Sequence, residues 1–305
     1  MTFRTLITLT MLLAFNTYTI YIPKNKPRPS SNPHISGDTF RSISQHIIDE
    51  TYQKFDPKNV QPGDVVFVQF EFMKQFFHEH HSRISNSYIL ITHNEDMSAP
   101  KQFIQYLDDP KIIAWLTQNC DLDAHYKLIP IPIGLSNKHW NHSCNHDQLI
   151  NKINQRKTTN KPTKVNLLYL NFSINTNSSI RRPIYNFFSK QPYCTTATKG
   201  SQDNFYHQLA QSKFTISPHG NGLDCHRTWE ALLLGCFPIV KASTLDELYK
   251  DLPVLIVQDW SEVTEEFLHK KYEEMCAQSY NMDKLYFPYW HEFINEIKEK
   301  YNPNN

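Results

Sequence analysis

The segment from Ser217 to Val240 constrains the fold of this chain more than any other, and it reads SPHGNGLDCHRTWEALLLGCFPIV. A short apolar strand leads into a glycine-bearing turn, and a helix is expected from Asp224 to Leu234. Gly235 follows where a helix commonly ends in glycine, before the next strand begins. Asp224 is predicted to cap the helix, because a carboxylate accepts hydrogen bonds from the unpaired amides of the first turn. This order of elements is typical of an α/β protein with a parallel sheet.

The rest of the chain shows the same alternation in two runs of similar size, which predicts two doubly wound α/β domains facing one another. The expected elements of the first run are strands 65–70, 87–92 and 127–131 and helices 73–80 and 101–107. Those of the second run are strands 165–170, 214–217, 237–240 and 254–257 and helices 203–210, 224–234 and 262–277. The polar stretch 151–164 is interpreted as the linker between the domains. A last helix, 284–301, is expected to pack back across the first domain.

The N-terminus is interpreted as a targeting segment. Residues 5–22 carry no charge, and as a helix they would span about 27 Å, just enough for a bilayer core. Arg4 before an apolar centre is also typical of a signal peptide. A membrane anchor and an export signal therefore both stay open, and a membrane-associated or secretory localisation is expected. The expected boundaries are 1–22 for this segment, 23–36 for a proline-rich linker, 37–160 and 161–280 for the two domains, and 281–305 for the C-terminal helix.

Composition excludes some classes of partner. The 31 basic and 30 acidic residues leave a net charge of +1, whereas proteins that bind nucleic acid usually carry a basic field. The six cysteines contain no CxxC pair, which argues against a zinc site. His78, His80 and His81 lie close together on one short helix, which is weak evidence for a metal, so no metal site is predicted there either.

The turn and helix after the strand at 214–217 have the chemistry of an anion site. Gly220 and Gly222 let a ligand approach the backbone at the carboxyl end of a strand, where open α/β sheets bind ligands. The amides at 221–223 lie at a helix N-terminus, which favours a phosphate. Arg227 and Glu230 share one helix face and could hold a diphosphate and ribose hydroxyls. Taken alone, such a pair is more often an ordinary ion pair on a solvated helix.

The combination of several stretches resembles the C-terminal signature of the exostosin family of glycosyltransferases. The stretches are SKFTISPHG at 212–220, Arg227-x-x-Glu230 and GCFPIV at 235–240, with LLYLNFSINTN at 167–177 followed by Arg181, and IPIPIGL at 129–135. The resemblance is specific over 167–257 and looser over 87–135. It implies an α/β fold of the GT-B type, in which two Rossmann-like domains face a cleft, here preceded by the N-terminal hydrophobic segment.

The resemblance also implies a nucleoside-diphosphate sugar as the donor, with a UDP-sugar favoured, and a glycan or glycoconjugate hydroxyl as the acceptor. It makes 37–160 the acceptor domain and 161–280 the domain that binds the nucleotide sugar. No cofactor or metal ion is required. It places Arg227 and Glu230 at the donor site and makes one of Arg181 and Arg182 a second phosphate contact; a solvated basic pair is the equal alternative. The predicted donor-binding residues are Arg181, Arg182, His219, Gly220, Asn221, Gly222, Arg227 and Glu230.

An inverting transfer needs a general base on the acceptor side. The strand at 87–92 runs directly into His93, Glu95 and Asp96, at an edge that would face the cleft in this architecture. These three residues are the candidate bases, and a polar loop in which Asp96 caps the next helix is the alternative.

Two other functions stay open. A non-catalytic nucleotide- or glycan-binding module would keep Arg227 and Glu230 but lack a working base. A polyol-phosphate transferase could use the same scaffold, because a fold does not determine its chemistry.

Overall fold

The computed structural model describes residues 28–51, 54–140, 146–158, 163–197 and 201–301. The predicted targeting segment, 1–22, lies outside this part of the chain. Within the described residues, no helix combines the length and the apolar character needed to cross a membrane.

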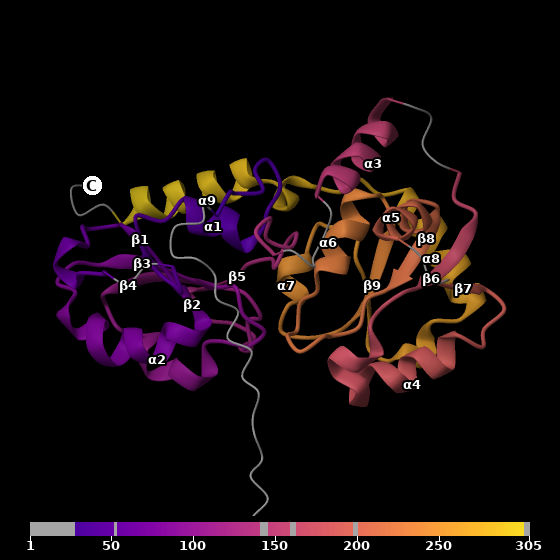
Figure 1. Cartoon of the computed structure of the whole chain (residues 1–305). Coiled ribbons are helices and arrows are strands. Elements are labelled where there is room, and N and C mark those ends of the chain that lie inside the picture. Colours follow the sequence, from indigo (N-terminus) through magenta and orange to yellow (C-terminus); the bar gives the residue numbers. More distant parts are fainter. Residues whose placement is uncertain (1–27, 52–53, 141–145, 159–162, 198–200, 302–305) are drawn as a thin grey trace, which may run out of the picture.

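The chain folds around two parallel five-stranded sheets, one in each half (Figure 1). The first sheet has the order β1-β2-β3-β4-β5, with strands β1 His46–Ile48, β2 Val65–Gln69, β3 Tyr88–His93, β4 Ile112–Thr117 and β5 Leu128–Pro130. The second has the order β10-β9-β8-β6-β7, with strands β6 Asn166–Leu170, β7 Cys194–Thr196, β8 Ser212–Ile216, β9 Phe237–Lys241 and β10 Leu255–Val257. The predicted fold of two facing Rossmann-like α/β units is confirmed.

The two sheets differ in how the chain winds through them. In the second sheet β6 pairs with both β7 and β8, so the direction of winding reverses between β6 and β8. In the first sheet the strands follow one another in sequence, so the winding does not reverse. The short helix α2 (Met73–Gln75) lies on one face of that sheet, and α1 (Gly37–Ser42) and α9 (Phe287–Lys300) lie on the other (Figure 1). A helix from the far end of the chain thus covers a face that the first unit's own connections leave open.

Side chains of the second sheet alternate between two apolar cores. Leu168 and Leu170 of β6 pack into one core, and Tyr169 between them packs into the other. The first core includes side chains of α4 (Ser178–Phe188) and α8 (Glu265–Cys276). The second core includes side chains of α5 (Gln202–Ala210), α6 (His226–Leu233) and α7 (Asp246–Tyr249), and it continues into the first unit. Apolar packing therefore joins the two units.

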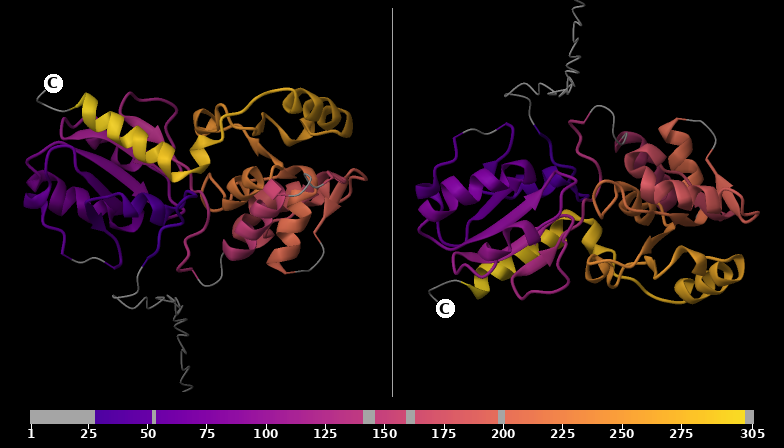
Figure 2. Two further views of the ribbon diagram at one scale, coloured as in Figure 1. Left: turned by 90° about the horizontal axis from the view of Figure 1, so that it is seen from above. Right: turned by 90° about the horizontal axis from the view of Figure 1, so that it is seen from below.

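The C-terminal helix packs across the first unit, as predicted. Trp290 of α9 is buried with its ring 5.6 Å from that of Phe40. The backbone amide of Phe287 also donates to the carbonyl of Pro33, at 2.8 Å. Figure 2 shows α9 running along the first unit after leaving the second.

The predicted linker at 151–164 is wrong for most of its length. Residues His146–Thr158 form a helix, α3, which packs against α5. Leu149 and Ile153 are both buried, one helical turn apart. A helix whose other faces are solvated needs only a narrow apolar stripe such as this one. The many polar residues of 151–164 therefore hide the helix in the sequence.

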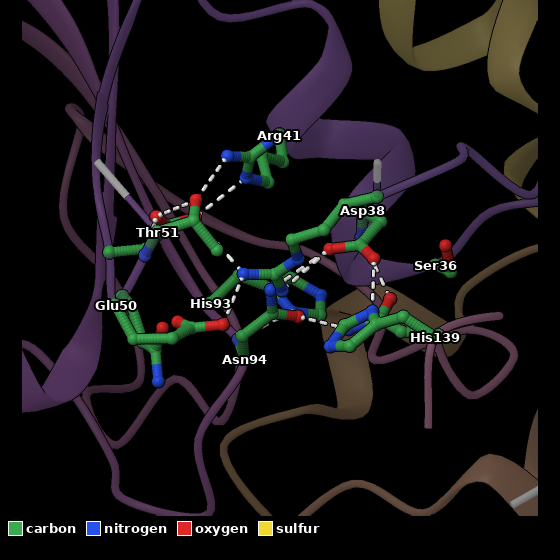
Figure 3. Close-up of polar contacts among 12 residues, drawn as sticks. Ser36, Asp38, Arg41, Glu50, Thr51, His93, Asn94 and His139 are labelled. Atoms are coloured by element: carbon green, nitrogen blue, oxygen red, sulfur yellow. Dashed lines mark hydrogen bonds and ion pairs between the residues drawn. The ribbon is translucent and has the colours of Figure 1, made fainter. Parts of the chain in front are cut away.

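The expected proline-rich linker at 23–36 is also shorter than predicted. From Arg28 onward the segment is part of the first unit, because the Arg28 side chain is only 2% exposed and pairs with three carboxylates. Its guanidinium nitrogens lie 2.8 Å from Asp38, 3.1 Å from Asp49 and 2.7 Å from Glu50. Figure 3 shows this network, in which Asp38 also contacts His139. The three carboxylates lie 10 to 22 residues further along the chain, so local composition could not reveal the network.

Burial alone would raise the pKa of both Asp38 and Asp49. The hydrogen bond from His139 and the charge of Arg28 more than offset this at Asp38, and hydrogen bonds from Arg41 and Thr51 do so at Asp49. Both pKa values therefore lie below the usual range. A carboxylate of this kind adds stability above its unfolded-state pKa, and that stability is lost as the pH falls through the folded-state pKa.

Arg28→Met is expected to lower the free energy of unfolding by about 3 kcal/mol or more at neutral pH, because the buried Asp38 and Asp49 lose their shared arginine and keep only His139 and Arg41 as basic partners. The difference in free energy of unfolding between wild type and the variant should narrow below about pH 4, where the carboxyl groups take up protons. Urea denaturation at several pH values measures both effects. Arg83→Met, at an exposed arginine, is the control. An Arg28 variant no less stable than this control would contradict the assigned role of the network.

Candidate functional site

A cavity of about 480 Å³ lies between the two units, at the carboxyl ends of strands from both sheets. We call it the interdomain cavity. On one side it is bounded by the segments after β6 and β8, the two strands between which the winding reverses. Open α/β sheets bind their ligands at this switch point. Asp96 and Ile133, from the loops after β3 and β5, lie on the other side. The remaining lining residues include Asn171, Phe172, Arg181, Gly220, Asn221, Gly222, His226, Arg227 and Glu230.

Two arginines converge on one aromatic ring in this cavity. The guanidinium carbons of Arg181 and Arg227 each lie 5.6 Å from the centre of the Phe172 ring. Arg181 is buried and donates to the carbonyls of His219, at 2.7 Å, and Ser173, at 2.9 Å. Neither arginine has a carboxylate within ion-pairing distance in the described part of the chain. Two like charges held this close favour an anion between them.

Arg227 has hydrogen-bonding capacity that the described chain does not use. Its Nε donates to the Asn171 carbonyl at 2.7 Å, whereas its Nη1 is shielded from solvent and has no acceptor. Burial lowers the pKa of Arg227, and the nearby Arg181 lowers it further, while Glu230 opposes the shift. A bound diphosphate would supply both the missing acceptor and the missing negative charge.

Glu230 lies one turn after Arg227 on α6, and both side chains line the cavity, as the three-residue spacing predicts. Glu230 is buried and accepts a hydrogen bond of 3.5 Å from the Tyr206 hydroxyl. Ser201 and Phe205, near the start of α5, line the same cavity. The Glu230 carboxylate thus lies at the cavity wall, next to the space that a ligand would fill.

The glycine turn brings the backbone close to Arg181. The Gly220 amide donates to the Gly222 carbonyl at 3.0 Å, and a Cβ at Gly220 would lie 3.1 Å from Arg181 Nη2. A Cβ at Gly222 would clash with the Asn119 side chain. His219 contributes its carbonyl to Arg181, but its side chain is not part of the cavity lining.

Of the three candidate bases, the structure brings Asp96 to the interdomain cavity. Its Oδ2 accepts a 3.0 Å hydrogen bond from Asn221 Nδ2, across the two units. Glu95 lines a different cavity. His93 is buried, with Nε2 3.0 Å from the Pro132 carbonyl. Burial lowers the pKa of His93 to about 4, so this ring is neutral near pH 7. His93 is also not among the residues that line the interdomain cavity.

Asp224 does not cap the helix as predicted, because Cys225 is the N-cap residue and α6 begins at His226. The Asp224 carboxylate instead accepts from the backbone amide of Ile133 in the first unit and from Trp229 Nε1 of α6, both at 2.8 Å. Burial raises the pKa of Asp224 to about 6, although its hydrogen bonds oppose this. Asp224 thus ties the two units together beside the cavity.

Sequence reasoning missed His226, which lines the interdomain cavity directly before Arg227. Its Nδ1 lies 2.8 Å from the Gly134 carbonyl, so Nδ1 carries the proton and the neutral ring keeps a lone pair on Nε2. Burial lowers the pKa of His226, while Asp96 opposes the shift. Only the contact with Gly134, 92 residues away, reveals this orientation.

Arg181 and Arg182 are neighbours with different environments, which makes them a matched pair. Arg181 is buried at the cavity, and Arg182 is exposed on α4. Arg181→Gln is expected to weaken binding of a nucleoside diphosphate about tenfold or more, because a charge-assisted contact is lost. Arg182→Gln should change it less than about twofold. Calorimetric titration compares the two variants, and equal effects would contradict the assignment of Arg181 to the site.

No group of three or more His, Cys, Asp or Glu side chains that could hold a metal ion lies in the part of the chain that the structure describes. Among the described residues, two cations, three carboxylates (Asp96, Asp224 and Glu230) and a histidine line the interdomain cavity.

In a comparison with known families, the C-terminal part of the chain has a match. Residues 184–303 match the RXYLT1 C-terminal domain, a xylosyltransferase-like family related to the exostosins. The matched segment includes α6 with Arg227 and Glu230, but it is less than half of the chain. The resemblance to exostosin-like glycosyltransferases predicted from the sequence is confirmed by this match.

Solved structures give distant likenesses. The α,α-trehalose 6-phosphate synthase of Burkholderia multivorans is 8% identical, with a TM-score of 0.39 over 79% of this chain and 72% of that one. A GtfA/B complex is 14% identical, with a TM-score of 0.33 over 79% of this chain and 55% of that one. We draw no functional conclusion from likenesses at these TM-scores. Comparison with curated proteins gives no match.

Proposed function

We propose, from the family match of residues 184–303 and the two arginines in the interdomain cavity, that this protein is a glycosyltransferase that uses a nucleoside-diphosphate sugar. The observation that carries the proposal is the convergence of Arg181 and Arg227 on Phe172, with Arg227 Nη1 unpartnered. A diphosphate has the charge and the acceptor oxygens that this arrangement lacks. A UDP-sugar is the donor we favour.

The donor is placed by groups along the cavity wall. Its diphosphate lies between Arg181 and Arg227, beside the glycine turn at 220–222 that lines the same cavity. Glu230 accepts hydrogen bonds from ribose hydroxyls, and the nucleobase lies toward Phe205 at the start of α5. Fixed cationic donors stabilise the charge that develops on the leaving diphosphate, and this stabilisation is commonly the largest single contribution to such a reaction.

The acceptor approaches from the first unit, where Asp96 lies. Asp96 takes the proton of the acceptor hydroxyl, whose oxygen then attacks the anomeric carbon. The bond between that carbon and the β-phosphate oxygen breaks, and the nucleoside diphosphate leaves with the bonding electrons. Attack from the side opposite the leaving group inverts the anomeric configuration. Arg181 and Arg227 compensate the leaving group's charge, so these steps need no metal ion.

A membrane-associated or secretory location, through residues 1–22, is part of the same proposal. It rests on the uncharged run at 5–22. Glycan acceptors and nucleotide sugars are the partners that the proposal names, and nucleic acid is not among them.

Incubation with a panel of nucleotide sugars tests the proposal. We expect release of one nucleoside diphosphate to depend on a glycan acceptor, and proton NMR of the product to show the inverted anomer. A retained anomer would contradict the single displacement. Turnover of a cytidine-diphosphate polyol alone would favour a polyol-phosphate transferase, and nucleotide binding without turnover on any glycan would favour a non-catalytic module.

A further inference from the structure

A second cavity, of about 710 Å³, lies in the first unit alone. It opens beside the carboxyl ends of β2 and β3, at the same edge of the sheet as the interdomain cavity. Its lining combines apolar, amide and charged side chains, which are Phe70, Glu71, Lys74, His78, Glu95, Met97, Gln102, Phe103 and Gln105.

One loop separates the two cavities. Glu95 and Met97 line the second cavity, and Asp96 between them lines the interdomain cavity. The backbone of this loop is held in place, since the side chains of Gln118 and Asn119 donate to the Glu95 carbonyl at 2.8 and 3.3 Å. A ligand in the second cavity would therefore lie beside Glu95 and Met97, the sequence neighbours of the proposed base Asp96.

The lining suits the two kinds of surface that a sugar presents. Phe103 is half-buried and Met97 is 49% exposed, so these two side chains offer apolar area to the C–H face of a sugar ring. Phe70 is itself buried and packs edge to face against Phe103, with the ring centres 6.2 Å apart. Gln102 and Gln105 are exposed amides able to donate to and accept from hydroxyl groups. Pockets that combine apolar surface with a few polar groups are typical of sites that bind small organic ligands.

The charges disfavour an anionic ligand. Glu71 and Glu95 both line the cavity, against one lysine and one histidine. Burial raises the pKa of Glu95, and the neighbouring Glu71 raises it further. Next to Glu95, Gln69 donates to its carboxylate at 3.4 Å, while Gln69 Oε1 is shielded from solvent and accepts no hydrogen bond. Glu71 and Glu95 can accept hydrogen bonds from hydroxyls, whereas both would repel a phosphate or carboxylate on the ligand.

We propose that the second cavity is the acceptor subsite and that it binds the uncharged sugar residues of a glycan. A glycan bound there crosses the loop at Asp96 and presents its terminal hydroxyl group in the interdomain cavity. This inference rests on the glycosyltransferase function proposed above, but it concerns a different cavity and different residues.

Saturation-transfer NMR tests the subsite without requiring turnover. The probes are uncharged gluco-, manno-, galacto- and xylo-oligosaccharides of two to six sugars, together with phosphorylated counterparts. We expect wild-type protein to bind at least one uncharged series, and Phe103→Ala to bind it about tenfold more weakly. Ile104→Ala, at an exposed neighbour on the same 3₁₀ helix (Lys101–Tyr106) but outside the lining, is the matched control and should bind as wild type does.

Gln105→Ala gives a second reading in case Phe103→Ala unfolds, and it should also weaken binding of the uncharged series. Binding that is confined to the phosphorylated probes, or unchanged in the cavity variants, would overturn the proposal. Calorimetry with UDP on the same samples separates the two hypotheses. Nucleotide binding without binding of any uncharged probe would overturn the subsite alone, and the reverse result would overturn the donor assignment while supporting the subsite.

Discussion

Arg227→Ala is expected to lower the rate of sugar transfer by about 10²- to 10³-fold, the range found when one fixed donor to a developing charge is removed. Within the described part of the chain Arg227 Nη1 has no acceptor, so this guanidinium can donate to a ligand atom. Nucleoside diphosphate binding should weaken in parallel, because the ground-state diphosphate uses the same contact. Initial rates and calorimetric titration measure the two effects.

Arg227→Lys is the informative companion variant. It keeps a positive charge but loses the planar fork that can hold two oxygens. An intermediate loss is therefore expected. The change leaves the Asn171 carbonyl without its 2.7 Å donor, so circular dichroism must show that both variants are folded. A folded Arg227→Ala protein with wild-type affinity for every nucleoside diphosphate would contradict the assignment.

Asp96→Asn is expected to lower the transfer rate by about 10³-fold while leaving nucleotide affinity within about twofold, because general-base catalysis commonly contributes 10²- to 10⁴-fold. An asparagine can still accept the hydrogen bond from Asn221, so the loop should keep its place. This separation of rate from affinity distinguishes a base from a residue that only supports the donor site.

Asp108→Asn, at an exposed carboxylate of the same unit, is the control and should transfer sugar at the wild-type rate. His226→Gln tests the other basic group in the cavity. If Asp96→Asn retains its rate and His226→Gln loses it, the base is His226, and the mechanism proposed for Asp96 is wrong.

In the second unit the sequence predicts the strands β6, β8, β9 and β10 and the helices α5, α6 and α8, but not β7, α4 or α7. Apolar runs such as 214–217 and 237–240 are bounded by glycine and proline, and Gly235 has the positive backbone angle that a glycine C-terminal to a helix adopts. β4, at Ile112–Thr117, was missed although its residues are all buried. An apolar run buried on both faces shows no alternation, so periodicity cannot distinguish it from a helix. β1 and β7 are only three residues long and give too little pattern.

The candidate site could likewise be predicted only in part from the sequence. Gly220, Gly222, Arg227 and Glu230 lie within one short segment, so their spacing alone brought them together. The choice of Arg181 over Arg182, and of Asp96 over His93, depends on which side chains the folded units turn toward the cavity. Phe172 and His226 acquire their roles only through contacts with distant segments, which no local pattern records.

A calorimetric titration of the purified, folded chain with each nucleoside diphosphate tests the donor site most directly. We expect one of them, UDP first, to bind with a dissociation constant on the order of micromolar, and Arg227→Ala to abolish this binding. Absence of binding to any nucleoside diphosphate by a folded protein would contradict the central claim that the interdomain cavity is a donor site.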